Sequence, residues 1–268
     1  MKGLEVLYRP SGPAREYAPL ACNLFTGCSH GCVYCYAPRC LHMTREEFSH
    51  PAPRPKILER LQKDVDRIVK ARPSPEACRG MEACCGSYMA DGPVLFCFTC
   101  DPYAPLEADM LITQKALRIL GEAGIRTRVL TKNGSLARRD FSLMKQYGVE
   151  FGVTICFDSE NMRAQWEPNA GSIAGRMNAL AEAHGLGIKT WVSVEPVIEP
   201  KAALRAMELC REHVDRFAVG KLNHAKSDVD WTAFLRDTLD QFAAWDCGYY
   251  IKDALWDFTD DVTLEKER

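Results

Sequence analysis

The sequence predicts an α/β protein of one domain, built as a partial (β/α)6 barrel of the TIM type. Short apolar runs alternate with amphipathic stretches along the 268 residues, and this alternation is typical of parallel βαβ units with right-handed connections. The apolar fraction of 47% suffices for a core. Because no repeat, low-complexity segment or long linker divides the chain, we expect residues 1–268 to form a single domain with its core at about 20–255.

The expected elements follow one another along the whole chain. We expect strands at 22–26, 94–99, 126–132, 151–157, 189–195 and 216–222, with 248–251 as a candidate last strand. The helical stretches lie near 56–71, 109–123, 138–147, 172–186, 201–212 and 230–244. Residues 72–92 are rich in Pro and Gly and predict an irregular insertion, and residues 257–268 predict a charged C-terminal tail.

One octapeptide, Cys28-Ser29-His30-Gly31-Cys32-Val33-Tyr34-Cys35, is the most informative segment. Three thiolates on one short loop can hold three irons of a 4Fe-4S cluster, and no fourth cysteine follows at the ferredoxin spacing, so one iron stays open for a ligand. The alternatives are a zinc site or a disulfide pair. Zinc sites usually show two separated ligand pairs, and disulfides need an oxidising compartment. We therefore expect Cys28, Cys32 and Cys35 to hold a 4Fe-4S cluster.

Composition and charge limit the partners and the cellular compartment that we expect for this chemistry. The formal charge of −2 gives no bulk electrostatic reason to bind nucleic acid, so a polyanion would need a local patch. Residues 1–19 carry no apolar signal-peptide core, and no stretch approaches the 18 apolar residues of a membrane span. We expect a cytoplasmic protein with reduced thiols and no membrane partner.

Polar residues end the apolar runs. They are Thr99 and Asp101, Lys132, Thr154, Glu195, and Lys221 with Asn223. In such barrels the chemistry lies at the carboxyl ends of the strands, so these residues become candidates for one shared site. Strand ends are also solvated in general, which is the alternative explanation for any single member of the set.

Several motifs resemble one known superfamily. The segments C-N-L-F-T-G-C at 22–28 and C-V-Y-C-Y-A at 32–37 resemble the spore photoproduct lyase-like branch of the radical S-adenosylmethionine (radical SAM) superfamily. Residues 99–107 resemble its T-D-P-Y-Q-P-x-E segment, with Cys100 inserted and Ala104 in place of Gln. R-E-E-F at 45–48, W-E-P at 166–168, W-V-S-V-E-P-V at 191–197, G-K-L-N-H at 220–224 and Y-Y-I-K at 249–252 are similar to the radical SAM mobile pair proteins. The resemblance runs from about Leu20 to Leu255.

The resemblance implies a barrel of the radical SAM kind that binds one cluster and S-adenosylmethionine and cleaves the sulfonium to a 5'-deoxyadenosyl radical. Tyr34 would pack beside the adenine, Thr99 and Asp101 would contact the methionine amino group, and Lys132 would meet its carboxylate. The remaining contacts fall to Thr154 (ribose or carboxylate), Glu195 (ribose hydroxyls), and Lys221 and Asn223 (adenine or substrate). Each could instead belong to a buried ion pair that closes the barrel.

Further cysteines need a separate interpretation. A C-x2-C pair is formed by Cys97 and Cys100, and three more cysteines lie upstream at 78, 84 and 85. The number of cysteines would therefore allow a second metal site. Residues three apart on a straight strand point to opposite faces, which favours a single cluster. The resemblance implies a hydrogen-atom donor near this strand end, for which Cys100 with Tyr103, or Cys97, is the candidate.

The resemblance also implies a nucleobase or lesion as the substrate, lifted from its stack into the barrel mouth. The cationic residues available are Arg126, Arg128, Lys132, Arg138 and Arg139, and Arg39, Arg45 and Lys56, with Tyr36 and His42 for stacking. The alternative is that these are solvated helix faces. A protein or small-molecule substrate, and an iron–sulfur sensor without turnover, are the other functions to weigh. Expected partners are an electron donor such as flavodoxin or ferredoxin and a second radical SAM protein.

Overall fold

A computed structural model describes residues 4–72, 92–223, 227–245 and 247–259. Its centre is a seven-stranded sheet in the order β1-β4-β5-β6-β7-β8-β9, and each neighbouring pair is parallel. The strands are β1 (Leu20–Ala21), β4 (Val94–Phe96), β5 (Thr127–Thr131), β6 (Glu150–Thr154), β7 (Thr190–Val197), β8 (Arg216–Lys221) and β9 (Gly248–Ile251). The sheet curls without pairing β1 to β9 in the described part of the chain, so the expected partial barrel is confirmed.

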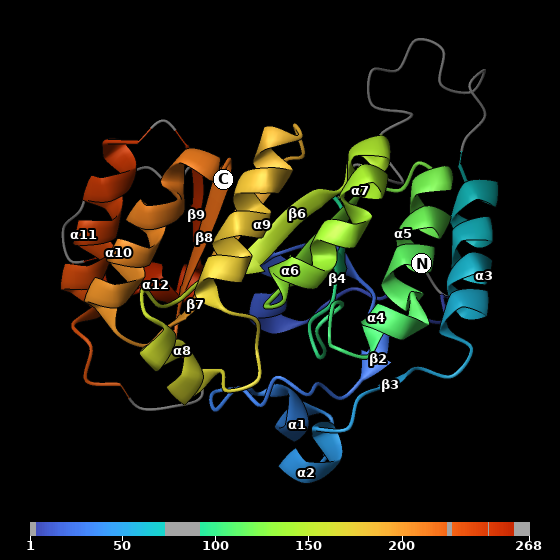
Figure 1. Ribbon diagram of the computed structural model, residues 1–268, viewed down its shortest axis with the longest axis horizontal. Coiled ribbons are helices and arrows are strands. Elements are labelled where there is room, and N and C mark those ends of the chain that lie inside the picture. Colours follow the sequence, from blue (N-terminus) through green and yellow to red (C-terminus); the bar gives the residue numbers. More distant parts are fainter. Residues whose placement is uncertain (1–3, 73–91, 224–226, 246, 260–268) are drawn as a thin grey trace.

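Six longer helices cover the outer face of this sheet (Figure 1). They are α3 (Ile57–Lys70), α5 (Ile112–Glu122), α7 (Phe141–Tyr147), α9 (Ile173–Gly185), α10 (Pro200–Cys210) and α11 (Trp231–Ala243). Each helix packs one apolar face on the sheet, and α3 is an example. Its buried residues recur at the three- and four-residue spacing of one helix face and are Ile57, Leu61, Val65 and Ile68. Most buried apolar side chains form one core that runs from Leu7 to Leu255, and a smaller cluster comprises Ala18, Leu95, Trp191 and Ala218.

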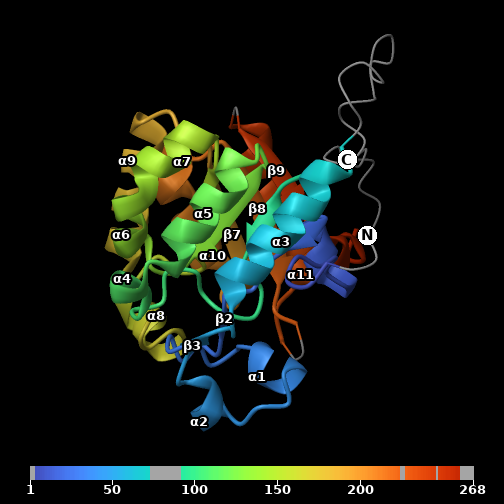
Figure 2. The ribbon, with the colours of Figure 1, turned by 90° about the vertical axis from the view of Figure 1, so that its right-hand side faces the viewer.

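Short elements fill the connections. They are η1 (Gly12–Glu16), β2 (Phe25–Thr26), α1 (Ala37–Cys40), α2 (Arg45–Phe48), β3 (Ala52–Pro53), α4 (Glu107–Met110), α6 (Gly134–Ala137), η2 (Arg138–Asp140), α8 (Glu160–Trp166), η3 (Arg211–His213) and α12 (Asp253–Trp256). The strands β2 and β3 pair antiparallel outside the main sheet. Together with α1 and α2 they project from one end of the barrel, as Figures 1 and 2 show.

The expected strand at 22–26 was wrong. The first barrel strand ends at Ala21, and Phe25 pairs with Pro53 in the small sheet. The cause is Asn23, whose side-chain Oδ1 accepts the backbone N–H groups of Phe98 (2.8 Å) and Thr99 (3.0 Å). Because a side chain takes these donors, the ladder between the first two barrel strands stops there. For the same reason β4 ends at Phe96 rather than at Thr99.

Two expected segments fall largely outside the described residues. These are the insertion at 72–92, of which 73–91 are not described, and the tail at 257–268, of which 260–268 are not described. Among the helices of the described residues, none has the length and apolar character needed to cross a membrane.

Candidate active site

The cysteine loop, residues 28–35, connects β2 to α1 at the carboxyl ends of the barrel strands. Cys32 is buried, and Cys28 and Cys35 are half-buried. Burial raises the pKa of all three thiols, while the ammonium of Lys132, at the end of β5, acts in the opposite direction on Cys32 and Cys35. The structure therefore brings a predicted cofactor residue to two of the three predicted cluster ligands, Cys32 and Cys35.

One side of the cysteine loop lies along residues 166–169, which we call the WEPN segment. Val33 N–H donates to the Trp166 carbonyl (2.9 Å), and Asn169 N–H donates to the His30 carbonyl (3.0 Å). The Asn169 amide also donates to the Ser29 carbonyl (3.1 Å). Gly31 has a φ of +68°, and a Cβ there would lie 3.2 Å from the Asn169 amide nitrogen. Backbone shape and close contact both favour glycine at this position.

The other side of the loop is held by Arg45 of α2. Its guanidinium donates to the carbonyls of Cys32 (3.1 Å) and Val33 (2.7 Å). The start of the loop is fixed by the end of the same helix, because Cys28 N–H donates to the Phe48 carbonyl (2.7 Å). These contacts leave little freedom to the backbone that carries the thiols.

A buried charged group, the Glu167 cluster, lies under the cysteine loop and comprises Tyr34, Lys132, Glu167 and Arg176. The Glu167 carboxylate is fully buried, pairs with Arg176 (2.6 Å) and lies 3.8 Å from the Lys132 ammonium. It also accepts a hydrogen bond from the Tyr34 hydroxyl. Burial by itself favours the neutral acid, but the charges of Arg176 and Lys132 hold the pKa of Glu167 below its usual value. The carboxylate is therefore ionised at neutral pH.

Asp101 joins the second barrel strand to the third. Its carboxylate accepts hydrogen bonds from Tyr103 N–H (2.8 Å), the Thr131 hydroxyl (2.6 Å) and Lys132 N–H (2.8 Å). The His30 ring nitrogen Nδ1 lies 3.6 Å from the same carboxylate. Asp101 thus has a structural role at the rim, and its expected contact with a methionine amino group stays a prediction.

Apart from Glu167 Oε2 and Arg176 Nη2, which form an ion pair with each other, three buried polar atoms near the loop have no hydrogen-bond partner within the described residues. They are the hydroxyl oxygens of Ser29 and Thr99 and the Nδ1 atom of His30. Buried polar groups in folded proteins nearly always have partners, so a cluster of unsatisfied ones indicates a place where a polar ligand belongs. Thr99 is one of the predicted cofactor residues, and its hydroxyl is free for such a contact.

A second buried group, the Glu195 cluster, closes the opposite side of the rim and comprises Tyr17, Glu195, Asn223 and Lys252. The Glu195 carboxylate accepts hydrogen bonds from Lys252 (3.0 and 3.1 Å), Tyr17 (2.5 Å) and Asn223 (3.1 Å). The sequence predicted Glu195 and Asn223 for one site, and the structure brings them together. Their expected contacts with ribose and adenine stay predictions.

Gly220 makes room for this cluster. A Cβ at Gly220 would lie 2.7 Å from Glu195 Cδ and 2.8 Å from Lys252 Cδ. Lys221, in contrast, points its ammonium toward Phe258, 4.8 Å from the ring centroid. The structure therefore does not place Lys221 with Glu195 and Asn223.

Thr154 and Cys156 lie between the two clusters. Thr154 is 2% exposed, and its carbonyl accepts a hydrogen bond from Arg176 (2.8 Å). Burial raises the pKa of Cys156, and the charges of Glu167 and Glu195 both add to the effect. The Cys156 thiol is thus within electrostatic reach of both clusters.

β4 ends at Phe96, so Cys97 and Cys100 belong to the bend that follows and not to a straight strand. The expectation that they point to opposite sides therefore stays a prediction. The Tyr103 side chain is fully buried and donates to Asp140 (2.9 Å). The role of Cys100 and Tyr103 as a hydrogen-donor pair stays a prediction.

In the described residues no group of three or more His, Cys, Asp or Glu side chains is gathered as the ligands of a single metal ion. A zinc ion needs thiolates at about 2.3 Å from one point, whereas a 4Fe-4S cluster takes one thiolate per iron and keeps its ligands apart. Cys78, Cys84 and Cys85 lie outside the described residues, so a second metal site stays untested.

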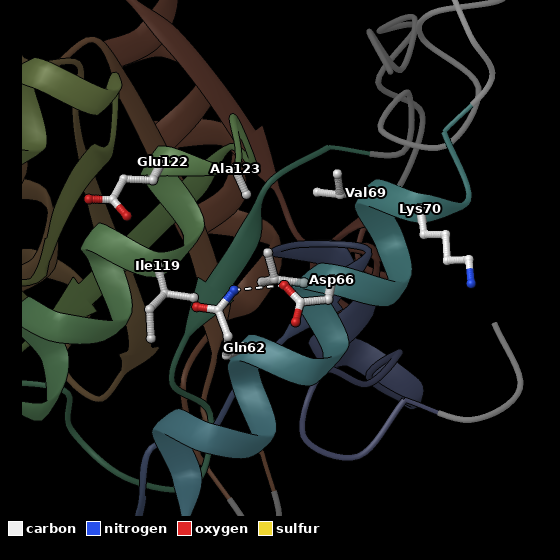
Figure 3. Close-up of a pocket in the computed structure, with 8 residues that line it drawn as sticks. Gln62, Asp66, Val69, Lys70, Ile119, Glu122 and Ala123 are labelled. Atoms are coloured by element: carbon white, nitrogen blue, oxygen red, sulfur yellow. Dashed lines mark hydrogen bonds between the residues drawn. The ribbon is translucent and has the colours of Figure 1, made fainter.

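A pocket lies elsewhere on the molecule, between the carboxyl-terminal halves of α3 and α5 (Figure 3). Gln62, Val65, Asp66, Val69, Lys70, Ile119, Glu122 and Ala123 line it. Figures 1 and 2 place these helix ends away from α1, α2 and the cysteine loop. In α/β barrels the end of the helices that precedes the next strand is the end remote from the chemistry, so this pocket does not belong to the candidate site.

Comparison with known proteins agrees with the fold. No family model matches the chain. An uncharacterized protein of Methanocaldococcus jannaschii is 25% identical over 193 residues, which cover 71% of this chain and 65% of that protein. This chain therefore spans just under two thirds of the length of that relative.

Solved structures are more informative. A spore photoproduct lyase variant with bound AdoMet and dinucleoside spore photoproduct matches with a TM-score of 0.66 and 16% identity, over 93% of this chain and 79% of that one. The chain has the fold of this lyase. SuiB of Streptococcus suis bound to S-adenosylmethionine matches with a TM-score of 0.60 and 12% identity, over 91% of this chain and 53% of that one. SuiB bound to the precursor peptide SuiA matches with a TM-score of 0.61.

Sequence analysis missed Tyr17, Glu167, Arg176 and Lys252. Two of them lay in quoted motifs, Glu167 in W-E-P and Lys252 in Y-Y-I-K, but without a role. A charged residue inside an otherwise apolar helix face is the available signal for Arg176, which is 1% exposed. Tyr17 carries no local signal, because its partner Glu195 is 178 residues away.

Proposed function

We propose that this protein is a radical SAM enzyme that holds one 4Fe-4S cluster and cleaves S-adenosylmethionine reductively. The observation that carries the proposal is the C-x3-C-x2-C loop, fixed from both sides at the carboxyl ends of the strands in a barrel with the fold of spore photoproduct lyase. Cys28, Cys32 and Cys35 are the proposed ligands. When bound, the cluster supplies the electron that breaks the sulfonium bond.

The charges around the loop suit this cofactor. Three thiolates and a cluster form an anionic group, and Lys132 and Arg176 act on Cys32 as opposing positive charges. Arg176 is already close to Glu167 (2.6 Å), whereas Lys132 is only loosely paired with it (3.8 Å). Lys132 therefore has charge available for the methionine carboxylate, and the unsatisfied Thr99 hydroxyl is available for the amino group. Thr154 and Tyr34 complete the proposed cofactor site.

The first test is anaerobic reconstitution with iron and sulfide, followed by dithionite, S-adenosylmethionine and chromatography for 5'-deoxyadenosine. We expect 5'-deoxyadenosine and about four irons per chain. Cys32→Ala should abolish both. Cys40→Ala is the matched control, because Cys40 is an exposed cysteine on α1 outside the motif, and it should change neither.

Other outcomes would change the proposal. Zinc in place of iron would contradict the assignment of the cysteine loop to an iron–sulfur cluster, and so would overturn the proposal. A bound cluster without 5'-deoxyadenosine would favour a non-catalytic iron–sulfur sensor or an enzyme that needs a partner. The partners that we propose are a flavodoxin or ferredoxin as electron donor and a second radical SAM protein.

For the substrate we propose a nucleic-acid base or lesion. The support is the similarity to spore photoproduct lyase with a bound dinucleoside spore photoproduct, together with the exposed Tyr36 (42%) beside the cysteine loop. The basic residues near β5 offer less positive charge to a bound nucleic acid than the sequence suggested, because several of them are paired with carboxylates. Arg128 pairs with Glu150, Arg138 with Glu182, and Arg139 with Glu107 and Asp140. The exposed Arg39 and Lys56 are the better candidates for phosphate contacts.

A peptide substrate is the second candidate, favoured by the match to SuiB bound to its precursor peptide. Binding of labelled single-stranded DNA at increasing salt separates the two. A nucleic-acid enzyme should lose affinity steeply with salt, and Arg39→Ala with Lys56→Ala should reduce the slope of log affinity against log salt by about 1.4. Weak binding that is insensitive to salt and to both substitutions would favour the peptide.

A further inference from the structure

The Glu167 cluster contains charges of both signs beneath the cysteine loop. Its cations are Lys132 and Arg176, and its carboxylate is Glu167. Arg176 and Glu167 form a close pair (2.6 Å) with side chains that are 1% and 0% exposed, whereas Lys132 Nζ lies 3.8 Å from the same carboxylate and its side chain is 18% exposed. The Tyr34 phenol stays neutral, because burial and Glu167 raise its pKa. The cluster therefore has one more cation than anions.

This charged group reaches the cysteine loop between two of the proposed ligands. Tyr34 stands between Cys32 and Cys35 in the sequence, and its hydroxyl donates to the Glu167 carboxylate. The ammonium of Lys132 lies 5.7 Å from the centroid of the Tyr34 ring. Burial raises the pKa of Cys32, and of the nearby charges Lys132 lowers that pKa while Glu167 raises it. The two side chains thus act on a proposed ligand in opposite directions.

The backbone holds these charges in place. Lys132 N–H donates to Asp101 (2.8 Å), and the Lys132 carbonyl accepts the N–H of Gly171 (2.9 Å). A Cβ at Gly171 would lie 2.8 Å from the Lys132 carbonyl oxygen, so this approach needs glycine. Arg176 donates to the carbonyls of Thr154 (2.8 Å) and Gly171 (3.0 Å). Because buried charges fixed in this way are poorly screened by water, they act strongly on a neighbouring group whose charge changes.

We propose that Glu167 and Lys132 set the reduction potential of the iron–sulfur cluster, Glu167 by lowering it and Lys132 by raising it. This inference rests on the proposed function and adds to it the control of the electron-transfer step. Reduction adds one electron to the 4Fe-4S group and makes that group more negative by one unit. A nearby carboxylate opposes this change, and a nearby ammonium favours it.

The balance between the two charges matters for the proposed reaction. The cluster must accept an electron from its donor and must still pass that electron to the sulfonium. A higher potential makes the first step easier and the second step harder. Opposing charges on Glu167 and Lys132 keep the potential between these two requirements.

The test is a redox titration of the reconstituted full chain without S-adenosylmethionine. Dithionite supplies electrons through viologen mediators, and electron paramagnetic resonance measures the reduced cluster. Glu167→Gln keeps the size and a hydrogen-bond acceptor for Tyr34 but removes the charge. We expect the ratio of reduced to oxidised cluster at a fixed potential to rise about tenfold, which is an upward shift of about 59 mV for a one-electron couple.

Lys132→Met removes the ammonium and keeps an unbranched side chain. We expect a shift of similar size in the opposite direction, and Lys132→Arg, which keeps the charge, should restore most of the wild-type potential. Glu182→Gln is the matched control, because its partner Arg138 and Glu182 itself are exposed. It should leave the potential unchanged.

The opposite signs separate an effect of charge from a loosened loop, which would shift both variants in the same direction. Shifts of the same sign, or shifts no larger than that of Glu182→Gln, would overturn the inference. If Glu167→Gln does not keep its cluster, Lys132→Met decides alone, and an unchanged or raised potential there would overturn it.

Failure of the proposed function gives a different result. A wild-type chain that takes up no iron–sulfur cluster would overturn the proposed function and this inference with it. A wild-type chain that holds the cluster but makes no 5'-deoxyadenosine would overturn only the enzymatic function, because the potential is measured without turnover.

Discussion

The Glu167 and Glu195 clusters stabilise a carboxylate in the same way at two places on the rim. In each, a carboxylate accepts a hydrogen bond from a tyrosine hydroxyl and faces a cation. Burial and the neighbouring carboxylate raise the pKa of both phenols, so Tyr17 and Tyr34 remain protonated donors. The chemistry of the two groups is therefore alike.

Their positions differ. The Glu167 side chain is 0% exposed and contacts the cysteine loop through Tyr34, whereas the Glu195 side chain is 15% exposed. The Glu195 cluster joins Tyr17, which follows η1, to Lys252, which follows β9. One cluster contacts the cysteine loop, and the other joins the open edges of the sheet. Similar ion pairs can thus serve a cofactor site or the closure of a fold, and only their neighbours tell which.

The largest expected effect comes from Glu167→Gln. This change leaves Arg176 buried without a negative partner, and loss of one member of a buried pair costs about 4 kcal/mol of unfolding free energy. Denaturant unfolding at neutral pH measures it. Glu182→Gln is the control, since the Arg138–Glu182 pair is 51% and 38% exposed and such surface pairs contribute at most about 1 kcal/mol. Equal effects of the two substitutions would contradict the buried-charge account.

The same variant predicts a pH dependence. Because the pKa of Glu167 is lower in the folded protein than in the unfolded chain, its ionised form stabilises the fold above the unfolded value of about 4.3. That contribution is lost as the pH falls through the lower, folded value. Denaturant unfolding of wild type and Glu167→Gln from neutral to acid pH should show the difference shrinking below about pH 4. If the difference in unfolding free energy between the two proteins grew on acidification, the pKa of Glu167 would not be lowered in the folded protein.

Gly220→Ala is expected to perturb the Glu195 cluster by about 2 kcal/mol, because the new Cβ would overlap Glu195 and Lys252. Gly185→Ala at the end of α9 is the matched control, since nothing lies within 4 Å of a Cβ there. Thermal unfolding should show a loss for the first and no loss for the second. Unchanged 5'-deoxyadenosine formation per folded chain would confirm that this cluster acts on the fold rather than on the chemistry.

The smallest expected effect on stability, about 1 kcal/mol, is that of Asn169→Ala, which removes one hydrogen bond to the Ser29 carbonyl. Its effect should appear instead in cluster retention, measured as iron per chain after gel filtration. Asn161→Ala on the exposed face of α8 is the control and should keep full iron. Equal iron in the two variants would show that the WEPN segment does not position the cysteine loop.

The fold and part of the site followed from local patterns. Alternating apolar runs predicted the barrel strands, and cysteine spacing predicted the loop that the structure holds between Arg45 and the WEPN segment. The rule that strand ends meet at one rim brought Glu195 and Asn223 together correctly. These predictions rest on residues that are close in sequence or on a general property of parallel sheets.

The errors arose where one side chain overrode a pattern. Asn23 ended both the strand at 22–26 and the strand after Phe96 by accepting two backbone donors, and so the alternation rule does not apply to Cys97 and Cys100, which lie after the end of β4. The pairs Tyr34–Glu167 and Tyr17–Glu195 join residues 133 and 178 positions apart. No local periodicity can predict such pairs.

The Glu195 cluster also determines when the fold can close while the chain is being synthesised. Glu16 accepts hydrogen bonds from the Tyr250 hydroxyl (3.2 Å) and Asp253 N–H (2.9 Å), so the edge strand β9 is fastened to the segment that precedes β1. While the ribosome is still adding α11, Tyr17 and Glu195 already exist, but the ammonium of Lys252 does not. Until Lys252 is made, Glu195 lacks the ammonium that pairs with it, so the seam between the two edges of the sheet closes only after β9 has been synthesised.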